Sequence, residues 1–174
     1  MKKLWSTIAG VLVALAAGSV VGAVPAGADT SNDQMLSVVN ASRAKYGASA
    51  LTWNADLSSS TKQYAEACKF EHSDSGGRYG ENLYAGTGNV SFDDAVQSWM
   101  AEASAYDYNH PGFSSATGHF TQVVWKGSTQ MTVGIGSCPA GTIFAQPSTF
   151  IVARFTPPGN VDGQFPENVG RPQN

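Results

Sequence analysis

The period of the apolar pattern changes along this chain, and that change restricts the fold more than any other feature. Residues 31–46 carry apolar side chains at helical spacing, and Gly47 is a natural helix end. Asn54 is suited to cap a second helix. Residues 133–138 and 150–155 instead have the pattern of short strands, each bounded by Gly or Pro. Helices followed by strands in one small domain predict an α+β sandwich.

A third helix is indicated by a capping box. Ser91 and Asp94 have the required spacing, and the helix that they open would bury Trp99 and its apolar neighbours. Residues 73–91, between the second and third helices, are rich in Gly and Asn and are predicted to be a loop. The Pro-rich tail from Pro157 onward is expected to be irregular.

The N-terminal segment, residues 1–28, has the pattern of an export signal. Two lysines precede an apolar run, and residues 26–28 read Ala-Gly-Ala, a small-residue cleavage site. Cleavage after Ala23 is the alternative. The apolar run is nearly long enough for a membrane anchor, but no basic stop-transfer segment follows it, which favours removal. We expect an exported protein, without stable membrane insertion after cleavage, whose residues 29–174 form a single domain.

The charge balance of the chain argues against nucleic acid as a partner. The formal net charge is −3, and removal of the two N-terminal lysines would make the remainder more acidic. A mildly acidic chain without a Lys/Arg cluster is a poor binder of nucleic acid or anionic membrane surfaces. Two sequons, at Asn40 and Asn89, are candidate N-glycosylation sites in a eukaryotic host. Asn89 is the better candidate because it lies in a Gly-rich segment.

Cys68 and Cys138 are the two cysteines of the chain. In the oxidising compartment that an export signal implies, they most simply form one disulfide. Closing so long a loop would stabilise the fold by about 4 kcal/mol on the chain-entropy estimate. Two buried free thiols are the alternative, which the predicted export disfavours.

The candidate chemical groups are scattered rather than gathered in a known catalytic motif. The sequence has no GxSxG nucleophile elbow, no HExxH and no phosphate-binding loop. His119 stands out because it follows a glycine and precedes the core-forming residues 120–125, where burial can tune an imidazole. With His72, Glu81 and Glu102, it could hold a divalent metal or provide an acid and a base. Their spacing alone does not bring these four residues together.

Six segments occur in the order found in one known family. They are Leu51-Thr52-Trp53-Asn54, His72-Ser73, Tyr79-Gly80-Glu81-Asn82-Leu83, Trp99-Met100-Ala101-Glu102, Gly118 to Trp125 and Phe150 to Asn160. Together they resemble the CAP superfamily, the SCP/PR-1-like secreted proteins. The resemblance implies a three-layer α-β-α sandwich. It also implies a cleft of two histidines and two glutamates that can hold a divalent metal such as zinc or magnesium, and these map onto His72, Glu81, Glu102 and His119.

The segment from Tyr106 to Phe113 is similar to the aromatic loop of the fungal Pry branch of this family, which is associated with sterol binding. Tyr106, Tyr108 and Phe113 would offer flat apolar faces to a rigid ring system. The alternative is a loop whose aromatic side chains pack into the core. His110, in an Asn-His-Pro-Gly turn of this segment, is expected to be exposed. The two cysteines also suit the fungal branch, since many plant members carry six.

These features lead to one favoured function and two alternatives. The favoured function is a secreted, non-catalytic protein that binds a sterol or another small lipid through Tyr106, Tyr108 and Phe113, with a metal supporting the cleft. The first alternative is a metal-dependent hydrolase or protease, in which Glu81 or Glu102 acts as general base on metal-bound water. The second is an interaction protein of host defence or virulence.

Overall fold

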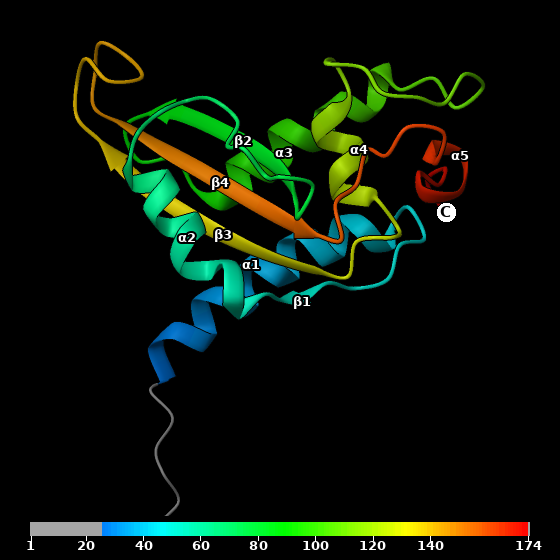
Figure 1. The fold of residues 1–174 in the computed structure, drawn as a ribbon, viewed down its shortest axis with the longest axis horizontal. Helices are drawn as coiled ribbons and strands as arrows, with labels where there is room; N and C mark the ends of the chain where they lie inside the picture. Colours follow the sequence, from blue (N-terminus) through cyan, green and yellow to red (C-terminus); the bar gives the residue numbers. More distant parts are fainter. Residues whose placement is uncertain (1–25, 174) are drawn as a thin grey trace, which may run out of the picture.

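A four-stranded mixed sheet forms the centre of the structure, which is a computed structural model describing residues 26–173 (Figure 1). The elements are, in chain order, α1 (Ala26–Ala44), β1 (Thr52–Trp53), α2 (Ala55–Glu66), β2 (Gly80–Thr87), α3 (Phe92–Ala101), the 3-10 helix η1 (Glu102–Ala105), α4 (Gly118–Val124), β3 (Gln130–Cys138), β4 (Ser148–Thr156) and α5 (Phe165–Asn168). The strands lie in the order β1-β3-β4-β2. β4 pairs antiparallel with both β3 and β2, and β1 pairs parallel with β3.

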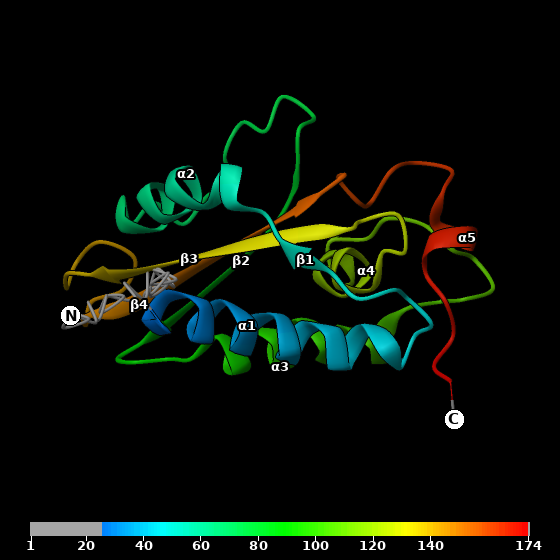
Figure 2. The ribbon, with the colours of Figure 1, turned by 90° about the horizontal axis from the view of Figure 1, so that it is seen from below.

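Helices cover both faces of the sheet (Figure 2). α2 lies on one face and packs against β3 and β4, whereas α1 and α3 lie side by side on the other face. α4 contacts both α1 and α3. This arrangement confirms the three-layer α-β-α sandwich that the family resemblance implied.

Local capping signals located two helices correctly. Asn54 caps α2 by accepting a hydrogen bond from the Leu57 backbone N–H at 3.1 Å. Ser91 and Asp94 form the expected capping box at the start of α3. The two predicted strands are also present, within the longer β3 and β4. Signals that act within a few residues therefore sufficed for these elements.

The predicted export signal falls mainly on residues 1–25, outside the described residues. Residues 26–28, where cleavage is expected, form the first residues of α1, which thus begins before the predicted residue 31. Gly47 follows this helix with a φ of +67°, a conformation that favours glycine. Within residues 26–173, no helix is long and apolar enough to cross a bilayer. The export signal itself stays a prediction.

The loop predicted for residues 73–91 is wrong in its second half. Gly80–Thr87 form β2, an edge strand that pairs with β4 along its whole length. The sequence hides this strand because Gly and Asn are poor strand formers and the pairing partner is distant in the chain. Gly80 is required by close packing, since a Cβ there would collide with the side-chain oxygen of Gln122 from α4.

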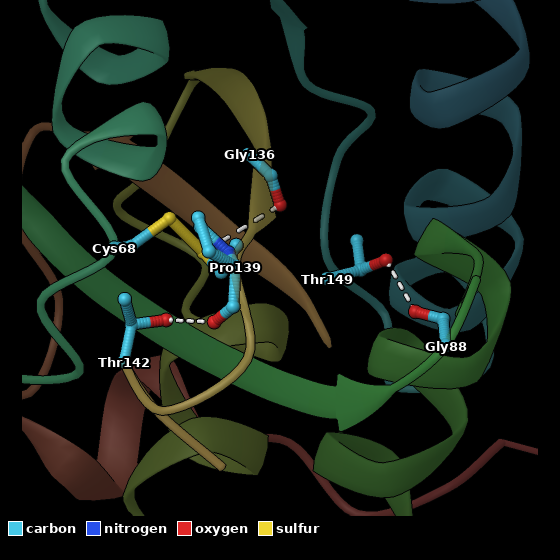
Figure 3. The surroundings of a disulfide bond; sticks show 7 residues. Cys68, Gly88, Gly136, Pro139, Thr142 and Thr149 are labelled. Carbon is cyan, nitrogen blue, oxygen red and sulfur yellow. Dashed lines mark hydrogen bonds between the residues drawn. A yellow bond between two sulfur atoms is a disulfide. The ribbon is translucent and has the colours of Figure 1, made fainter. Parts of the chain in front are cut away.

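The sheet divides the core into two clusters, and a disulfide ties the smaller one together. Ala65, Leu83, Cys138, Phe150 and Val152 form the smaller cluster, beneath α2. The predicted disulfide is confirmed and joins Cys68, just after α2, to Cys138 at the end of β3 (Figure 3). It attaches the α2 layer to the sheet a few residues before His72.

A fully buried arginine fixes α4 from its C-terminal end. The guanidinium of Arg43, on α1, donates hydrogen bonds to the carbonyls of Val123 and Trp125 at 2.8 and 2.9 Å. Burial lowers the pKa of Arg43 to about 10. Because carbonyls at a helix C-terminus carry partial negative charge, this contact stabilises the last turn of α4. It thereby fixes the helix that carries His119.

Candidate functional site

His119 is the second residue of α4, and its imidazole is oriented by Glu102. The Nδ1 atom of His119 lies 2.6 Å from Oε1 of Glu102. The other carboxylate oxygen, Oε2, accepts the backbone N–H groups of His119 at 3.0 Å and Phe120 at 3.1 Å. Thr117, the residue in the N-cap position, makes no side-chain cap. Since a carboxylate is stabilised at a helix N-terminus, Glu102 both caps α4 and orients His119.

The ring of His119 also packs against the core. It stacks on Trp99 of α3, with ring centroids 6.2 Å apart and planes 20° from parallel. The indole N–H of Trp99 donates to the Leu83 carbonyl at 3.0 Å. The His119 side chain is 33% exposed. A stacked and hydrogen-bonded imidazole of this kind is held in one orientation, and its Nε2 makes no hydrogen bond within residues 26–173.

His72 follows α2, and its imidazole is the more exposed of the two. Its Nδ1 lies 3.1 Å from Oε1 of Glu81, which stands on β2. The His72 side chain is 62% exposed, whereas the Glu81 side chain is 5% exposed. This pair therefore joins a surface imidazole to a buried carboxylate.

The buried carboxylate of Glu81 is neutralised by Arg154 of β4. The two residues stand directly opposite each other in the ladder, and the Arg154 Nε–H donates to Oε2 of Glu81 at 3.0 Å. Ser73 adds its backbone N–H, 2.9 Å from Oε1, and its hydroxyl, 2.6 Å from Oε2. Burial acts to raise the pKa of Glu81, but hydrogen bonds from His72, Ser73 and Arg154 outweigh it and lower the pKa to about 2. The group is thus a carboxylate at neutral pH.

β2 connects the two His–Glu pairs through consecutive residues. Side chains alternate between the faces of a strand, so Glu81 and Asn82 point to opposite sides of the sheet. Asn82 is buried, and its amide donates to the His119 carbonyl at 3.0 Å. One edge strand therefore carries both the side chain that orients His72 and a side chain that anchors the backbone of His119.

A cleft of about 300 Å³ lies between the two pairs. The residues lining it are His72, Glu81, Asn82, Phe113, Ser115, Gly118, His119 and Asn160. Three of the four residues of the predicted tetrad line it, whereas Glu102 acts from behind His119. Asn160 is fixed by its amide, which donates to the Gly118 carbonyl at 2.8 Å, and by its Oδ1, which accepts from the Thr121 hydroxyl at 2.6 Å.

The donor chemistry of the cleft fits a metal held by imidazoles rather than by four protein ligands. Histidines that bind metals commonly give one ring nitrogen to a carboxylate and the other to the ion. Nδ1 of His72 and of His119 each face a glutamate, which leaves Nε2 for an ion. Across residues 26–173, no three His, Cys, Asp or Glu side chains gather as a metal site on their own. Water or a bound ligand would have to complete the coordination.

The three predicted lipid-contact residues lie at different depths. Tyr106 is 8% exposed, and its ring packs against Phe120 and Tyr108 with centroid distances of 5.7 and 4.9 Å. Tyr108 is half-buried against the core. Phe113 is 63% exposed, and its ring lies so close to Gly118 that a Cβ there would approach it to 2.9 Å. The structure therefore places Tyr106 in the core and Phe113 at the mouth of the cleft.

The C-terminal tail holds the aromatic loop from outside. The guanidinium of Arg171 lies 4.9 Å from the Tyr108 ring centroid and donates to Oδ1 of Asn109 at 3.1 Å. The backbone N–H of Gln173 donates to the Lys45 carbonyl, just after α1, at 2.6 Å. The tail that was expected to be irregular thus contains the short α5 and is fixed at both the loop and the end of α1.

Three other predicted residues lie away from the cleft. His110 is exposed, as expected for its turn, and its Nδ1 lies 2.8 Å from Asp107. Asn89 is exposed between β2 and α3. Asn40 is half-buried on α1, where its amide group bonds the Leu51 backbone through both Oδ1 and Nδ2. Glycosylation at either sequon stays a prediction.

Arg154 and Asn82 were missing from the sequence-based candidates. Arg154 stands within an apolar strand, and a charged residue in a buried strand needs a partner, which is the signal that could have found it. Asn82 carries no such signal, because asparagine is common in loops and the Gly- and Asn-rich sequence around it predicts a loop.

A larger groove lies elsewhere, between α1 and α3. Its volume is about 650 Å³, and Met35, Val38, Phe92 and Ile135 are among the residues that line it. None of the predicted site residues lines this groove. Size and predicted chemistry therefore point to different places on the molecule, and the polar groups with fixed geometry are at the smaller cleft.

Comparisons with known proteins give matches over most of the chain. The family model CAP, described as the cysteine-rich secretory protein family, matches residues 36–155. Protein PRY2 of Saccharomyces cerevisiae is 40% identical over 121 residues, which cover 68% of this chain and 34% of the yeast protein. The chain thus spans about a third of that relative. The Golgi-associated plant pathogenesis-related protein 1 of Homo sapiens is 35% identical over 150 residues, covering 82% of this chain and 94% of the human protein.

A solved structure has the same fold. The crystal structure of NaASP2 with Zn2+ matches with a TM-score of 0.64 at 18% identity, covering 80% of this chain and 86% of that chain. At this identity the likeness establishes the architecture alone.

Proposed function

The chain belongs to the CAP family of cysteine-rich secretory proteins, and from that premise we propose that it is secreted and binds a sterol or a related small lipid. The predicted export signal supports secretion. The bound lipid would occupy the cleft between the two His–Glu pairs, beneath the aromatic loop.

One observation carries this proposal: an aromatic side chain stands exposed at the mouth of a cleft with polar walls. Phe113 is 63% exposed, and its ring lies over Gly118, next to His119. A flat apolar ligand would cover this ring and remove it from water. Asn160 also lines the cleft, and its amide has a second N–H besides the one that bonds Gly118, which can donate to a hydroxyl group. This arrangement suits an amphiphile with a rigid apolar body and a small polar head.

The aromatic loop has to open for a whole sterol to bind. The cleft volume of about 300 Å³ is at the lower end for ligand pockets. Within the loop, Tyr108 is half-buried against the core and Tyr106 is deeper, so both gain access to a ligand only when the loop moves. Gly112 supplies backbone freedom for that movement.

A divalent metal held by the two imidazoles would complete the site. The free Nε2 atoms of His72 and His119 suit zinc better than magnesium, which prefers oxygen ligands. A related structure was solved with Zn2+, which supports this choice. The ion would supply a positive charge beside the polar group of the lipid, while Glu81 and Glu102 keep the imidazoles in place.

The contacts of the two glutamates favour binding over hydrolysis. A general base has to accept a proton from water. Both oxygens of Glu81 are engaged, and its pKa of about 2 makes it a weak base. Both oxygens of Glu102 accept N–H groups of α4. We therefore assign both residues orienting roles.

Binding of a radiolabelled sterol to the purified protein tests the proposal. We expect saturable binding by the wild type and about tenfold weaker binding by Phe113→Ala, because burial of a Phe side chain is worth about 1.5–3 kcal/mol. Phe144→Ala is the matched control, since Phe144 is also an exposed phenylalanine but lies between β3 and β4. It is expected to bind like the wild type.

Two outcomes would contradict the assignment. Equal binding by the wild type and Phe113→Ala would show that Phe113 of the aromatic loop does not contact the lipid. Loss of binding in Val38→Trp, with Phe113→Ala unaffected, would place the lipid in the groove between α1 and α3. A chelator should weaken sterol binding, and added zinc should restore it. Sterol binding that changes with neither would refute only the proposal that a metal takes part.

A further inference from the structure

We propose that Arg154 is a positioning residue for His72: through Glu81 and Ser73 it fixes the imidazole in the orientation and tautomer that leave Nε2 free for an ion. The inference rests on the proposed function, because it concerns one of the two imidazoles assigned to the metal. Arg154 does not line the cleft, so its effect is carried by Glu81.

Arg154 is itself rigidly held. Its side chain is 4% exposed. The guanidinium carbon lies 4.4 Å from the ring centroid of Tyr79 and 5.1 Å from that of Tyr64. Nη1 donates to the hydroxyl of Ser60 on α2 at 3.4 Å. Because a planar guanidinium stacks on aromatic rings, the two tyrosines set the directions of its N–H groups.

The guanidinium reaches two groups that act together on His72. Nε donates to Oε2 of Glu81 at 3.0 Å, and Nη2 donates to Oγ of Ser73 at 3.1 Å. Ser73 in turn donates its hydroxyl to Oε2 at 2.6 Å and its backbone N–H to Oε1 at 2.9 Å. The plane of the carboxylate is thus fixed from several directions, with Oε1 facing Nδ1 of His72.

His72 depends on this carboxylate more than His119 depends on its own. Within the described part of the chain, the one side-chain hydrogen bond of His72 is to Glu81. His119 is additionally stacked on Trp99. A neutral imidazole that donates from Nδ1 to a carboxylate has its lone pair on Nε2, which is the form that binds a metal. Disturbing the Glu81 carboxylate should therefore affect His72 and spare His119.

The geometry calls for arginine at this position. Its fork spans two acceptors, whereas a lysine ammonium is a point donor that keeps the charge without the fork. Arg154→Lys therefore separates the geometric role from the charge. Ser73→Ala removes the second acceptor and leaves the Arg154–Glu81 pair in place, which makes it a milder variant.

The tautomer of His72 in the metal-free protein is the direct readout. Nitrogen NMR of the labelled imidazoles should show the Nδ1–H form for His72 and His119 in the wild type. Arg154→Lys is expected to convert His72 to a mixture of tautomers and leave His119 unchanged. Calorimetric titration with Zn²⁺ should show an affinity about tenfold lower, with Ser73→Ala in between.

Each other outcome has a defined meaning. An unchanged His72 tautomer in the folded variants would overturn the proposal, and so would an equal change at His119, which marks general loosening. A lower zinc affinity without a tautomer change would also overturn it. If Arg154→Lys does not fold, the His72 tautomer is measured in Ser73→Ala instead, and an unchanged tautomer there would overturn the proposal. If the wild type binds no zinc, the metal part of the proposed function fails, and the tautomer still decides the role of Arg154.

Discussion

The two His–Glu pairs of the cleft have the same chemistry and different supports. Glu102 is held by backbone N–H groups at the start of α4, and its histidine stacks on Trp99. Glu81 is held by Arg154 and Ser73, while its histidine extends towards solvent. The Glu102 carboxylate is therefore held by backbone N–H groups, whereas the Glu81 carboxylate is held by a buried arginine and a serine. We expect different mutations and conditions to destabilise the two pairs.

The largest expected effect separates the pairs by stability. Glu81→Ala leaves the Arg154 charge buried and unpaired, and breaking a buried pair in this way costs about 3–5 kcal/mol. Glu102→Ala removes a helix cap and should cost about 1–2 kcal/mol. Urea unfolding followed by tryptophan fluorescence measures both losses. Equal losses of unfolding free energy in the two variants would contradict the proposal that the two glutamates are held in different ways.

Acid should weaken the Glu81 pair next. Its native pKa is lowered from 4.5 to about 2, so its contribution to stability is fully present above pH 4.5 and is lost as the pH falls towards 2. The loss is at most about 3 kcal/mol. Urea unfolding across this range should show a shallower acid dependence in Glu81→Gln than in the wild type. Parallel curves would mean that another carboxylate controls the acid response.

The strand that joins the pairs gives a smaller effect. Asn82→Ala leaves the buried carbonyl of His119 without its donor, which should cost about 1–2 kcal/mol. Hydrogen exchange should quicken at the amides of α4 and stay unchanged at Ser73, whose N–H bonds Glu81. Faster exchange at both places would show that the halves are not independent.

The smallest expected effect concerns the aromatic loop, the third wall of the cleft. Arg171→Ala removes a surface cation–π contact worth about 0.5–1 kcal/mol. Exchange of the amides in residues 106–113 should rise severalfold, with α4 unaffected. Arg78→Ala is the matched control, because Arg78 lies over Tyr79 away from the loop. Faster exchange of residues 106–113 in both variants would show that the Arg171–Tyr108 contact does not specifically hold the loop.

The sequence predicted the parts of the fold that have local signals. The caps at Asn54 and Ser91 are read from neighbouring residues, and export made the Cys68–Cys138 disulfide the simplest pairing. β2 was missed because its Gly- and Asn-rich segment acquires strand structure only by pairing with β4. Periodicity cannot report a partner that is distant in the chain.

The prediction of the site was limited for the same reason, since it also depends on contacts between segments that are distant in the chain. The family resemblance implied one cleft for the four tetrad residues, but their division into two pairs depends on contacts between segments that the sequence does not place together. Arg154 reaches Glu81 only because the β2–β4 register sets them opposite each other. The aromatic loop was identified from its composition, yet composition could not show that Tyr106 turns inward while Phe113 stays exposed.

The location of the lipid is the central claim, and covalent labelling tests it most directly. A sterol that carries a photoreactive group should be crosslinked to the wild-type protein and the labelled peptides identified by mass spectrometry. We expect label on residues 106–119, the aromatic loop and the start of α4. Label on α1 and α3 instead, around Met35 and Phe92, or no saturable label at all, would contradict binding in the cleft between the two His–Glu pairs.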